Sequence, residues 1–416
     1  MLPIAPSLPF APQLHRLGRI LSLLLLLTLA TSAQGDEPAH RDEPQPAART
    51  AADKPAEGPL EPFLGHARFE TQQLFESQRF PNVVVTTDGT VVAVWGQKNV
   101  RVRRSGDGGA TFEPEIVVAA SGIHSGGATV DEQRGDLLVF VEDRHPPAPL
   151  TLYRSRDQGR SWAAEKVTIA PDRHGNVPSM HMNEHGITLR RGPQAGRLLR
   201  AARYYAAGNR RGQWSQHYTT AIYSDDGGAT WKTSDPFPEM GTGEATLAER
   251  ADGSVYYNSR LHWPQARRPT SRRHAVSRDS GATWDDWAIV DVLPDGPQTT
   301  AYGCMGGLVR LPVEDRDILL FSNVDTRGAR RERTTVWVSC DGGATWPLKR
   351  LVDEGPGGYS SLAAGRPETA SEGSIYLLYE AGGGRARLAR SNLSWLLAGE
   401  ATGDGQLPAW LARSSE

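Results

Sequence analysis

A cluster of metal-ligand residue types lies in the middle of the chain. His181, Glu184 and His185 have the H-x-x-E-H spacing that binds zinc in some proteases when the motif lies on a helix. Pro178 precedes the motif and Gly186 follows it, which leaves little room for a helix. We therefore favour a loop over a zinc site, and we predict no metal and no other cofactor.

The chain has two cysteines, Cys304 and Cys340. In an exported protein a disulfide between them is plausible, and two buried thiols are the alternative. Two cysteines supply too few ligands for a metal site of their own.

A third chemical pattern is an eight-residue turn, S-x-D-x-G-x-[TS]-[WF]. Its Asp can accept backbone N–H bonds, its Gly allows a tight turn, and its aromatic ring can be buried between neighbouring sheets. A turn rich in Asp and Gly could bind a ligand, but five equivalent copies indicate a shared structural role. The copies occupy residues 105–112, 155–162, 224–231, 277–284 and 339–346.

The sequence segments around these turns have the patterns of short strands and hairpins. Asp88-Gly89 and Asp252-Gly253 are hairpin signals between apolar runs. A motif that recurs at intervals of roughly 50 to 70 residues indicates a propeller, a solenoid or another repeat array. We predict an all-β fold, a six-bladed β-propeller of four-stranded antiparallel sheets with five such turns. A strand from residues 60–80 is expected to complete the last blade.

Composition and charge exclude some partners. The chain has 416 residues, 23% of them charged, and a net charge of −2, which argues against a nucleic-acid partner. Its 44 Gly, 29 Pro and 11 Trp fit a protein rich in turns and strands. We expect a monomer.

The N-terminal segment resembles a targeting signal. Arg16 and Arg19 precede an apolar run over 20–30, and Thr31-Ser32-Ala33 fits a cleavage site. We predict a signal peptide over 1–33, with an uncleaved anchor as the alternative, and no stable membrane insertion. A disordered linker over 34–58, the propeller over 59–400 and a C-terminal tail over 401–416 should follow. The protein would then be exported, to a periplasmic or extracellular location.

The repeated turn resembles the Asp box, or BNR repeat, of the sialidase (neuraminidase) superfamily, and the chain resembles a bacterial exo-α-sialidase. Further segments resemble sialidase motifs in the family's order, and the resemblance covers residues 65–397. These segments are Gln78-Arg79-Phe80-Pro81, Gly243-Glu244, Tyr256-Tyr257-Asn258-Ser259-Arg260, Phe321-Ser322-Asn323 with Arg331, Gly358-Tyr359-Ser360-Ser361-Leu362 and Leu377-Leu378-Tyr379-Glu380.

The resemblance implies a substrate-carboxylate site made of Arg79, Arg260 and Arg331. A sialic acid carries a carboxylate on its anomeric carbon, and arginines bind carboxylates with strong, partly bidentate hydrogen bonds. The three arginines belong to different repeats, so only a closed ring would bring them together. Glu380 would contact Arg79 on the side away from the substrate and orient its guanidinium.

The resemblance also implies that Tyr359 is the nucleophile and Glu244 its base. A carboxylate nucleophile would be repelled by the carboxylate of the substrate, whereas a neutral phenol avoids this repulsion. With an ordinary pKa near ~10, a phenol needs a base within hydrogen-bond reach.

One expected residue is missing. Sialidases usually hold an acid/base Asp in a loop of the first blade, but the equivalent segment here, 96–104, is short and has no carboxylate. The next blade offers Glu142-Asp143-Arg144-His145 as a substitute, with Asp143 as the possible acid/base and an ordinary charged rim loop as the alternative.

The segment 181–185 would lie near the sugar, where a histidine could contact its hydroxyls. The pocket could also be lined by Tyr204, Tyr205 and Trp214.

The predicted function is an exo-acting retaining glycoside hydrolase. It would release a terminal sialic acid or a related nonulosonic (2-keto sugar) acid through a tyrosyl-linked intermediate, from a sialylated or nonulosonate-bearing glycan. The missing Asp leaves three alternatives open: a different nonulosonic acid, an acid that has migrated, or a lectin-like propeller that binds without cleaving. A protein-binding propeller is disfavoured because it would not need the arginine and tyrosine set.

Overall fold

The structure is a computed structural model that describes residues 56–263, 271–295, 303–326, 328 and 330–412. The predicted signal peptide over 1–33 and nearly all of the predicted linker lie outside the described residues. In the described part, no helix is long and apolar enough to cross a membrane.

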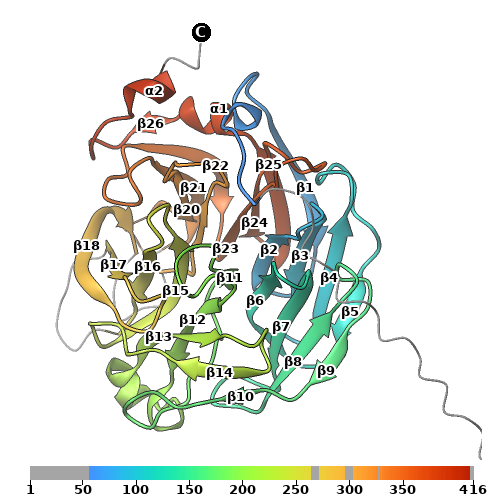
Figure 1. Cartoon of the computed structure of the whole chain (residues 1–416), viewed down its shortest axis with the longest axis vertical. Helices are drawn as coiled ribbons and strands as arrows, with labels where there is room; N and C mark the ends of the chain where they lie inside the picture. The colour runs from blue at the N-terminus through green and yellow to red at the C-terminus, as the bar shows by residue number, and fades with distance from the viewer. Residues whose placement is uncertain (1–55, 264–270, 296–302, 327, 329, 413–416) are drawn as a thin grey trace, which may run out of the picture. The chain divides into compact units, whose positions relative to one another are not determined.

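Six sheets surround a common centre (Figure 1), which confirms the predicted six-bladed β-propeller. Blade 1 contains β2 (Pro81–Val85), β3 (Val91–Trp95), β4 (Val100–Ser105) and β5 (Ile116–Ala119). Blade 2 contains β6 (Ile123–Asp131), β7 (Asp136–Glu142), β8 (Leu150–Ser155) and β9 (Ala163–Glu165). Blade 3 contains β11 (Ile187–Thr188), β12 (Leu198–Tyr204), β13 (Tyr218–Ser224), β14 (Thr230–Thr233) and an outer β10 (Thr168–Ile169).

The remaining three blades follow in chain order. Blade 4 contains β15 (Thr242–Glu249), β16 (Val255–Leu261), β17 (Ser271–Ser277) and β18 (Asp285–Pro294). Blade 5 contains β19 (Gly307–Arg310), β20 (Leu319–Val324), β21 (Glu332–Ser339), β22 (Leu348–Pro356) and an outer β26 (Glu400–Ala401). Blade 6 contains β23 (Ser360–Ala364), β24 (Ile375–Ala381), β25 (Arg385–Ser391) and β1 (Phe69–Phe75).

Short helices connect or cover the strands. They are η1 (Glu61–Phe63), η2 (Ala206–Gly208), η3 (Arg211–Gln216), α1 (Leu393–Leu397) and α2 (Ala409–Ala412). Blades 3 and 5 differ from the predicted four-stranded pattern because each gains a short fifth strand, and β10 runs parallel to β14. After β26, Leu411 of α2 is buried in the apolar cluster beside blade 5.

The last blade is closed by the first strand of the chain. β1 pairs antiparallel with β25, from Phe69 opposite Ser391 to Phe75 opposite Ala386. The ring of Phe69 also stacks on Trp395 of α1, with ring centroids 4.1 Å apart. The prediction that a strand within residues 60–80 completes the last blade is therefore confirmed.

Each Asp box is held by one set of hydrogen bonds. In the third box, Asp226 accepts the hydroxyl of Ser224 at 2.7 Å, and the backbone N–H and hydroxyl of Thr230 at 2.9 and 2.6 Å. The corresponding bonds form at Asp107, Asp157, Asp279 and Asp341. The repeated turn is thus a closed structural unit, as its fivefold recurrence predicted.

Each box is also tied to the preceding blade by an arginine, and we call these five residues the inter-blade arginines. In every case the guanidinium donates to the carbonyl of the fourth box residue. The bonds run from Arg390 to Gly108 (2.9 Å), Arg104 to Gln158 (2.5 Å), Arg154 to Gly227 (3.0 Å), Arg197 to Ser280 (3.1 Å) and Arg250 to Gly342 (2.8 Å).

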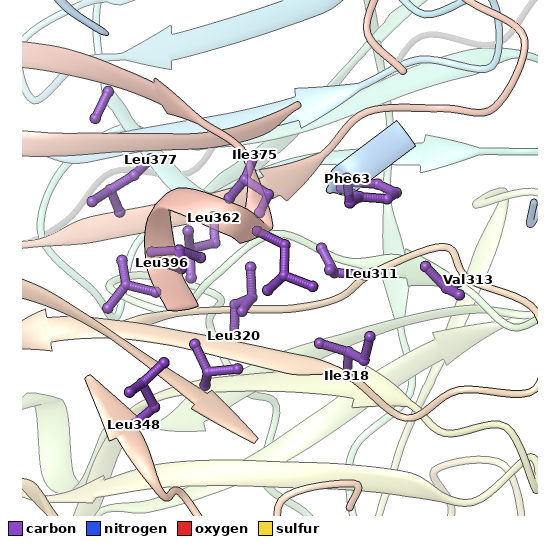
Figure 2. Packing of buried hydrophobic residues seen from close by; sticks show 14 of the residues in the cluster. Phe63, Leu311, Val313, Ile318, Leu320, Leu348, Leu362, Ile375, Leu377 and Leu396 are labelled. Atoms are coloured by element: carbon purple, nitrogen blue, oxygen red, sulfur yellow. The ribbon is translucent and has the colours of Figure 1, made fainter. Parts of the chain in front are cut away.

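Blade 6 has no box, so its contact with blade 5 lacks the arginine–box bond. Leu320 from blade 5 and Leu377 from blade 6 belong to one buried cluster, which Leu396 of α1 and Phe63 of η1 extend (Figure 2). Apolar clusters also lie between the other neighbouring blades. The ring is therefore sealed by hydrophobic packing at all six interfaces, with an added arginine–box contact at five of them.

A salt-bridge cluster lies at the mouth of the ring where the inner strands end. Arg190, Arg191 and Arg310 line a cavity of about 120 Å³ there. Glu57, which precedes η1, enters this cluster, with carboxylate oxygens 2.7 Å from Arg191 and 2.5 Å from Arg310. Backbone hydrogen bonds between Gly58 and the 312–314 segment hold Glu57 in place.

Candidate active site

The residues predicted to act on substrate gather at the other mouth of the ring. Tyr359 immediately precedes β23, Glu244 lies near the start of β15, and Arg260 lies near the end of β16. In an antiparallel blade, the start of the first strand and the end of the second lie at the same edge. The boxes follow the ends of third strands and so lie at the opposite edge, away from these residues.

Tyr359 and Glu244 form the centre of the site. The Tyr359 hydroxyl donates to Glu244 Oε1 at 2.5 Å, and Arg260 Nη1 donates to Glu244 Oε2 at 2.7 Å. Glu244 is only 1% exposed and sits at a register shift between β15 and β16, with φ of +59°. Such a bulge aims a side chain out of the regular pleat.

The charges around this pair set its protonation. Burial alone would raise the pKa of Glu244, but the charge of Arg260 and the Tyr359 hydrogen bond hold that pKa below its ordinary value. Burial and the charge of Glu244 raise the pKa of Tyr359 well above its ordinary value, despite the nearby arginines. At neutral pH the pair is therefore a neutral phenol bonded to a carboxylate, which is a base in position to take the phenol proton.

Two more predicted arginines flank the Tyr359 ring. The guanidinium carbons of Arg79 and Arg331 lie 5.0 and 5.3 Å from the ring centroid. Arg79 makes two hydrogen bonds of 3.0 Å to Glu380, and its side chain is 38% exposed, open to a ligand. The structure thus brings together all six of the residues Arg79, Glu244, Arg260, Arg331, Tyr359 and Glu380.

Arg331 has two arginine neighbours in the sequence that face elsewhere. Arg330 is 83% exposed and lies 3.4 Å from Glu332, and Arg333 pairs with Glu354 at 2.6 Å. Arg331 instead donates to the carbonyl of Gly303 at 2.7 Å beside the tyrosine.

Several buried polar residues around the pair were missed by sequence reasoning. Arg272 is fully buried and donates to the Glu244 carbonyl at 3.0 Å, to the Cys304 carbonyl at 3.1 Å and to Asn258 at 2.8 Å. Asp295 accepts the backbone N–H of Leu261 at 2.9 Å and lies 3.4 Å from Arg272. Neither residue has a clear sequence signal. Arg272 lies in a strand with several polar residues, and Asp295 follows a strand that already contains three aspartates.

The first-blade loop is short and lacks a carboxylate, as the sequence indicated. Gln78 Oε1 accepts the backbone N–H groups of Gln97 and Lys98 at 2.9 and 2.8 Å, and Gln78 donates to Asn99 at 2.6 Å. These bonds tie the loop back onto the segment that carries Arg79.

In blade 2, Glu142 ends β7 and is buried, whereas Asp143 and His145 are exposed in the following loop. Burial raises the pKa of Glu142 to about 7. The His145 and His181 rings are 4.8 Å apart, and Glu142 Oε2 lies 3.9 Å from His181 Nδ1.

The H-x-x-E-H residues lie in a turn and loop, as predicted, and they contact different partners. His181 packs on Phe80 with ring centroids 5.4 Å apart, and Glu184 accepts a hydrogen bond from Ser361. His185 Nε2 lies 3.0 Å from the Leu362 carbonyl. In the described part of the chain no group of three His, Cys, Asp or Glu side chains is arranged to hold a metal ion.

The remaining predicted residues divide between the site and its surroundings. Tyr205 is buried and its ring lies 5.7 Å from His145, whereas Tyr204 packs on Tyr218 and Trp214 on Trp263.

Cys304 is a buried thiol in the apolar cluster that contains Tyr359, and Cys340 is a separate thiol in the fifth box. The disulfide alternative is therefore wrong, because the two cysteines lie in different clusters.

Comparisons with known proteins agree with this arrangement. Residues 188–377 match the family described as BNR repeat-like domain. The sialidase of Micromonospora viridifaciens is 31% identical over 362 residues, which cover 77% of this chain and 52% of that protein. The sialidase of Bacteroides fragilis is 28% identical over 356 residues, which cover 73% of this chain and 59% of that protein. The chain thus spans between half and two thirds of the length of these relatives.

Solved structures give the same fold. The Hadza microbial sialidase Hz136 has a TM-score of 0.59 and 26% identity, with 76% of this chain and 66% of that chain covered. The intramolecular trans-sialidase from Ruminococcus gnavus also has a TM-score of 0.59, at 15% identity, with 77% and 95% covered, a likeness of fold alone. The boxes, the ring and these relatives together lead to one conclusion: the chain is a sialidase-like BNR-repeat propeller.

Proposed function

We propose that the chain is an exo-acting retaining glycosidase that releases a terminal sialic acid or a related nonulosonic acid from a glycoconjugate. The observation that carries the proposal is the 2.5 Å hydrogen bond from the Tyr359 hydroxyl to Glu244, flanked by Arg79, Arg260 and Arg331. The sialidase relatives support the same activity class.

In the first step, the arginines bind the substrate carboxylate and place the anomeric carbon against the Tyr359 oxygen. The phenol proton passes to Glu244 as the oxygen attacks, and the bond to the leaving group breaks. Arg260 keeps Glu244 in the carboxylate form that can accept this proton. The developing positive charge of the sugar lies beside the tyrosine and the substrate carboxylate.

In the second step, water replaces tyrosine at the anomeric carbon. Glu244 returns its proton to the departing phenolate, so the resting pair is restored. Two displacements on the same carbon give net retention of configuration.

The proposal extends to the rest of the chain. Residues 1–33 act as an export signal, 34–58 as a linker and 59–400 as a monomeric catalytic propeller that needs no cofactor, with a tail over 401–416.

The test is turnover of an aryl α-sialoside, followed by trapping with 2,3-difluorosialic acid. Fluorine at C3 slows both steps, whereas fluoride on the anomeric carbon is a good leaving group that keeps the first step faster than the second. The covalent intermediate should therefore accumulate, and mass spectrometry should find the sugar on the peptide that contains Tyr359. Tyr359→Phe should abolish turnover and labelling. Tyr379→Phe is the matched control, because Tyr379 is buried and bonds a carboxylate, Asp353 at 2.9 Å, outside the site. Turnover that survives Tyr359→Phe would refute the assignment.

A second candidate is a propeller that binds a sugar acid without cleaving it. The short first-blade loop over 96–99, which has no carboxylate, favours this candidate. Calorimetric binding of a 2,3-dehydrated sialic acid, together with no turnover of any aryl nonulosonide, would establish it.

A further inference from the structure

Three titratable side chains form a row from the surface of blade 2 inward. His145 is exposed, whereas the side chains of His181 and Glu142 are only 1% and 2% exposed. The His145 and His181 rings meet edge to face at 4.8 Å, and His181 Nδ1 lies 3.9 Å from Glu142 Oε2. The row joins β7, the loop after β7 and the 178–186 segment that leads to β11.

The inner two members of the row carry buried polar atoms without a hydrogen-bond partner. Both ring nitrogens of His181 and Oε2 of Glu142 have none among the described residues, although the hydroxyls of Ser179 and Ser125 lie close enough to Glu142 to counter part of the rise in its pKa. A buried polar atom without a hydrogen bond costs about 1–3 kcal/mol, so such atoms are rare unless they have a role. The 3.9 Å gap between His181 Nδ1 and Glu142 Oε2 is longer than a hydrogen bond.

This row lies directly against the tyrosine site. Phe80 contacts His181 on one side and Tyr359 on the other, with ring centroids 5.4 and 5.7 Å apart. Met182, the residue after His181, places its sulfur 3.2 Å from the Tyr359 hydroxyl. Phe80 and Met182 therefore join the row, at His181, to the tyrosine site.

We propose that His145 is the acid/base residue of this site and that His181 and Glu142 are positioning residues that hold His145 in place. This inference rests on the proposed glycosidase function. It assigns the proton transfer to a histidine in the second blade, in place of the carboxylate that the first-blade loop lacks.

The proton balance is complete without another reactant. As the Tyr359 oxygen bonds the anomeric carbon, the bond to the leaving oxygen breaks, and that oxygen takes the proton of protonated His145. Neutral His145 then accepts a proton from the attacking water in the second step. Each cycle consumes one water and returns both His145 and Glu244 to their starting states.

The groups around His145 set the pH at which it can donate. Burial and the charge of Arg203 lower the pKa of His145, although its hydrogen bond to the Pro146 carbonyl raises it. His181 and Tyr205 also face His145, at ring distances of 4.8 and 5.7 Å. His217, Arg79 and His124 complete the charged and titratable surroundings of the row.

The experiment compares kcat/KM for two substrates that differ in leaving group. Sialyllactose has an alcohol leaving group that needs a proton, whereas a nitrophenyl sialoside has one that does not. His145→Gln should lower kcat/KM about 100-fold or more on sialyllactose and less than about 10-fold on the aryl substrate. Glu142→Gln and His181→Asn should show a weaker form of this pattern.

Two controls separate the outcomes. His174→Gln replaces an exposed histidine in another loop and should leave both rates unchanged. Asp143→Asn tests the neighbouring exposed carboxylate, and a leaving-group-dependent loss there instead would overturn the proposal. Equal losses on both substrates in His145→Gln, or a wild-type protein that cleaves only the aryl substrate, would also overturn it. A wild-type protein that cleaves neither substrate would refute the proposed function itself.

Discussion

Arg79 and Glu380 face each other through two hydrogen bonds of 3.0 Å, although 301 residues separate them in the sequence. The same carboxylate accepts the backbone N–H groups of Phe80 at 3.2 Å and Tyr359 at 3.1 Å. Glu380 therefore fixes both the proposed substrate-binding residue Arg79 and the backbone of the proposed nucleophile.

Glu380→Gln should consequently lower kcat/KM for an aryl sialoside by about 10- to 100-fold, since an amide cannot accept all four of these bonds. We expect both a higher KM and a lower kcat, measured by steady-state kinetics. A change in KM alone would mean that Glu380 acts only through Arg79.

Arg331→Ala should weaken substrate binding, because this guanidinium lies beside the tyrosine ring. Loss of one charge-assisted contact costs about 1.5–3 kcal/mol, or roughly 10- to 100-fold in KM. Arg330→Ala is the matched control, since Arg330 is 83% exposed and pairs only with Glu332 among the described residues. Equal effects of the two substitutions would show that the assignment of Arg331 is wrong.

The Asp boxes should make the fold sensitive to acid. Hydrogen bonds from Thr111 and Ser105 lower the pKa of Asp107 to about 2. A carboxylate whose folded pKa lies below its unfolded value of ~3.9 stabilises the fold above that pH, and the stabilisation is lost as pH falls towards about 2. The melting temperature should therefore drop over this range. Asp107→Asn should melt lower than wild type at pH 7 and show a shallower drop, whereas parallel curves would contradict the prediction.

Glu57 should stabilise the propeller without affecting its chemistry. Burial would raise the pKa of Glu57, but hydrogen bonds and charges from Arg191 and Arg310 lower it, so this stabilisation is also lost in acid. Glu57→Gln leaves the buried Arg310 with a weaker partner, and we expect a loss of about 1–3 kcal/mol in the free energy of unfolding. Denaturant unfolding measures the loss, and KM should stay unchanged because the cluster lies at the opposite mouth of the ring.

The sequence could predict the features that depend on neighbouring residues in the chain. The boxes, the hairpins and the closing strand depend on short motifs and apolar alternation, and the family motifs marked Arg79, Glu244, Arg260, Arg331, Tyr359 and Glu380. The row of His145, His181 and Glu142 depends on how blades 2 and 3 pack, which no short motif encodes. The same is true of Arg272 and Asp295. The extra strands β10 and β26 are two residues long, too short to show any periodicity.

The pairing of β1 with β25 has a consequence for the order of events after synthesis. β1 is made before every other strand of the propeller, whereas its partner β25 is made after the strands of the first five blades that form around the ring, apart from the short β26. Contacts between such distant segments form slowly, so we expect ring closure to be the final step of folding. Arg79 follows β1 and Glu380 lies on β24 of the same blade, so a chain that has not closed cannot pair Arg79 with Glu380. The seam would thus delay completion of the proposed site until all six blades have been made and folded.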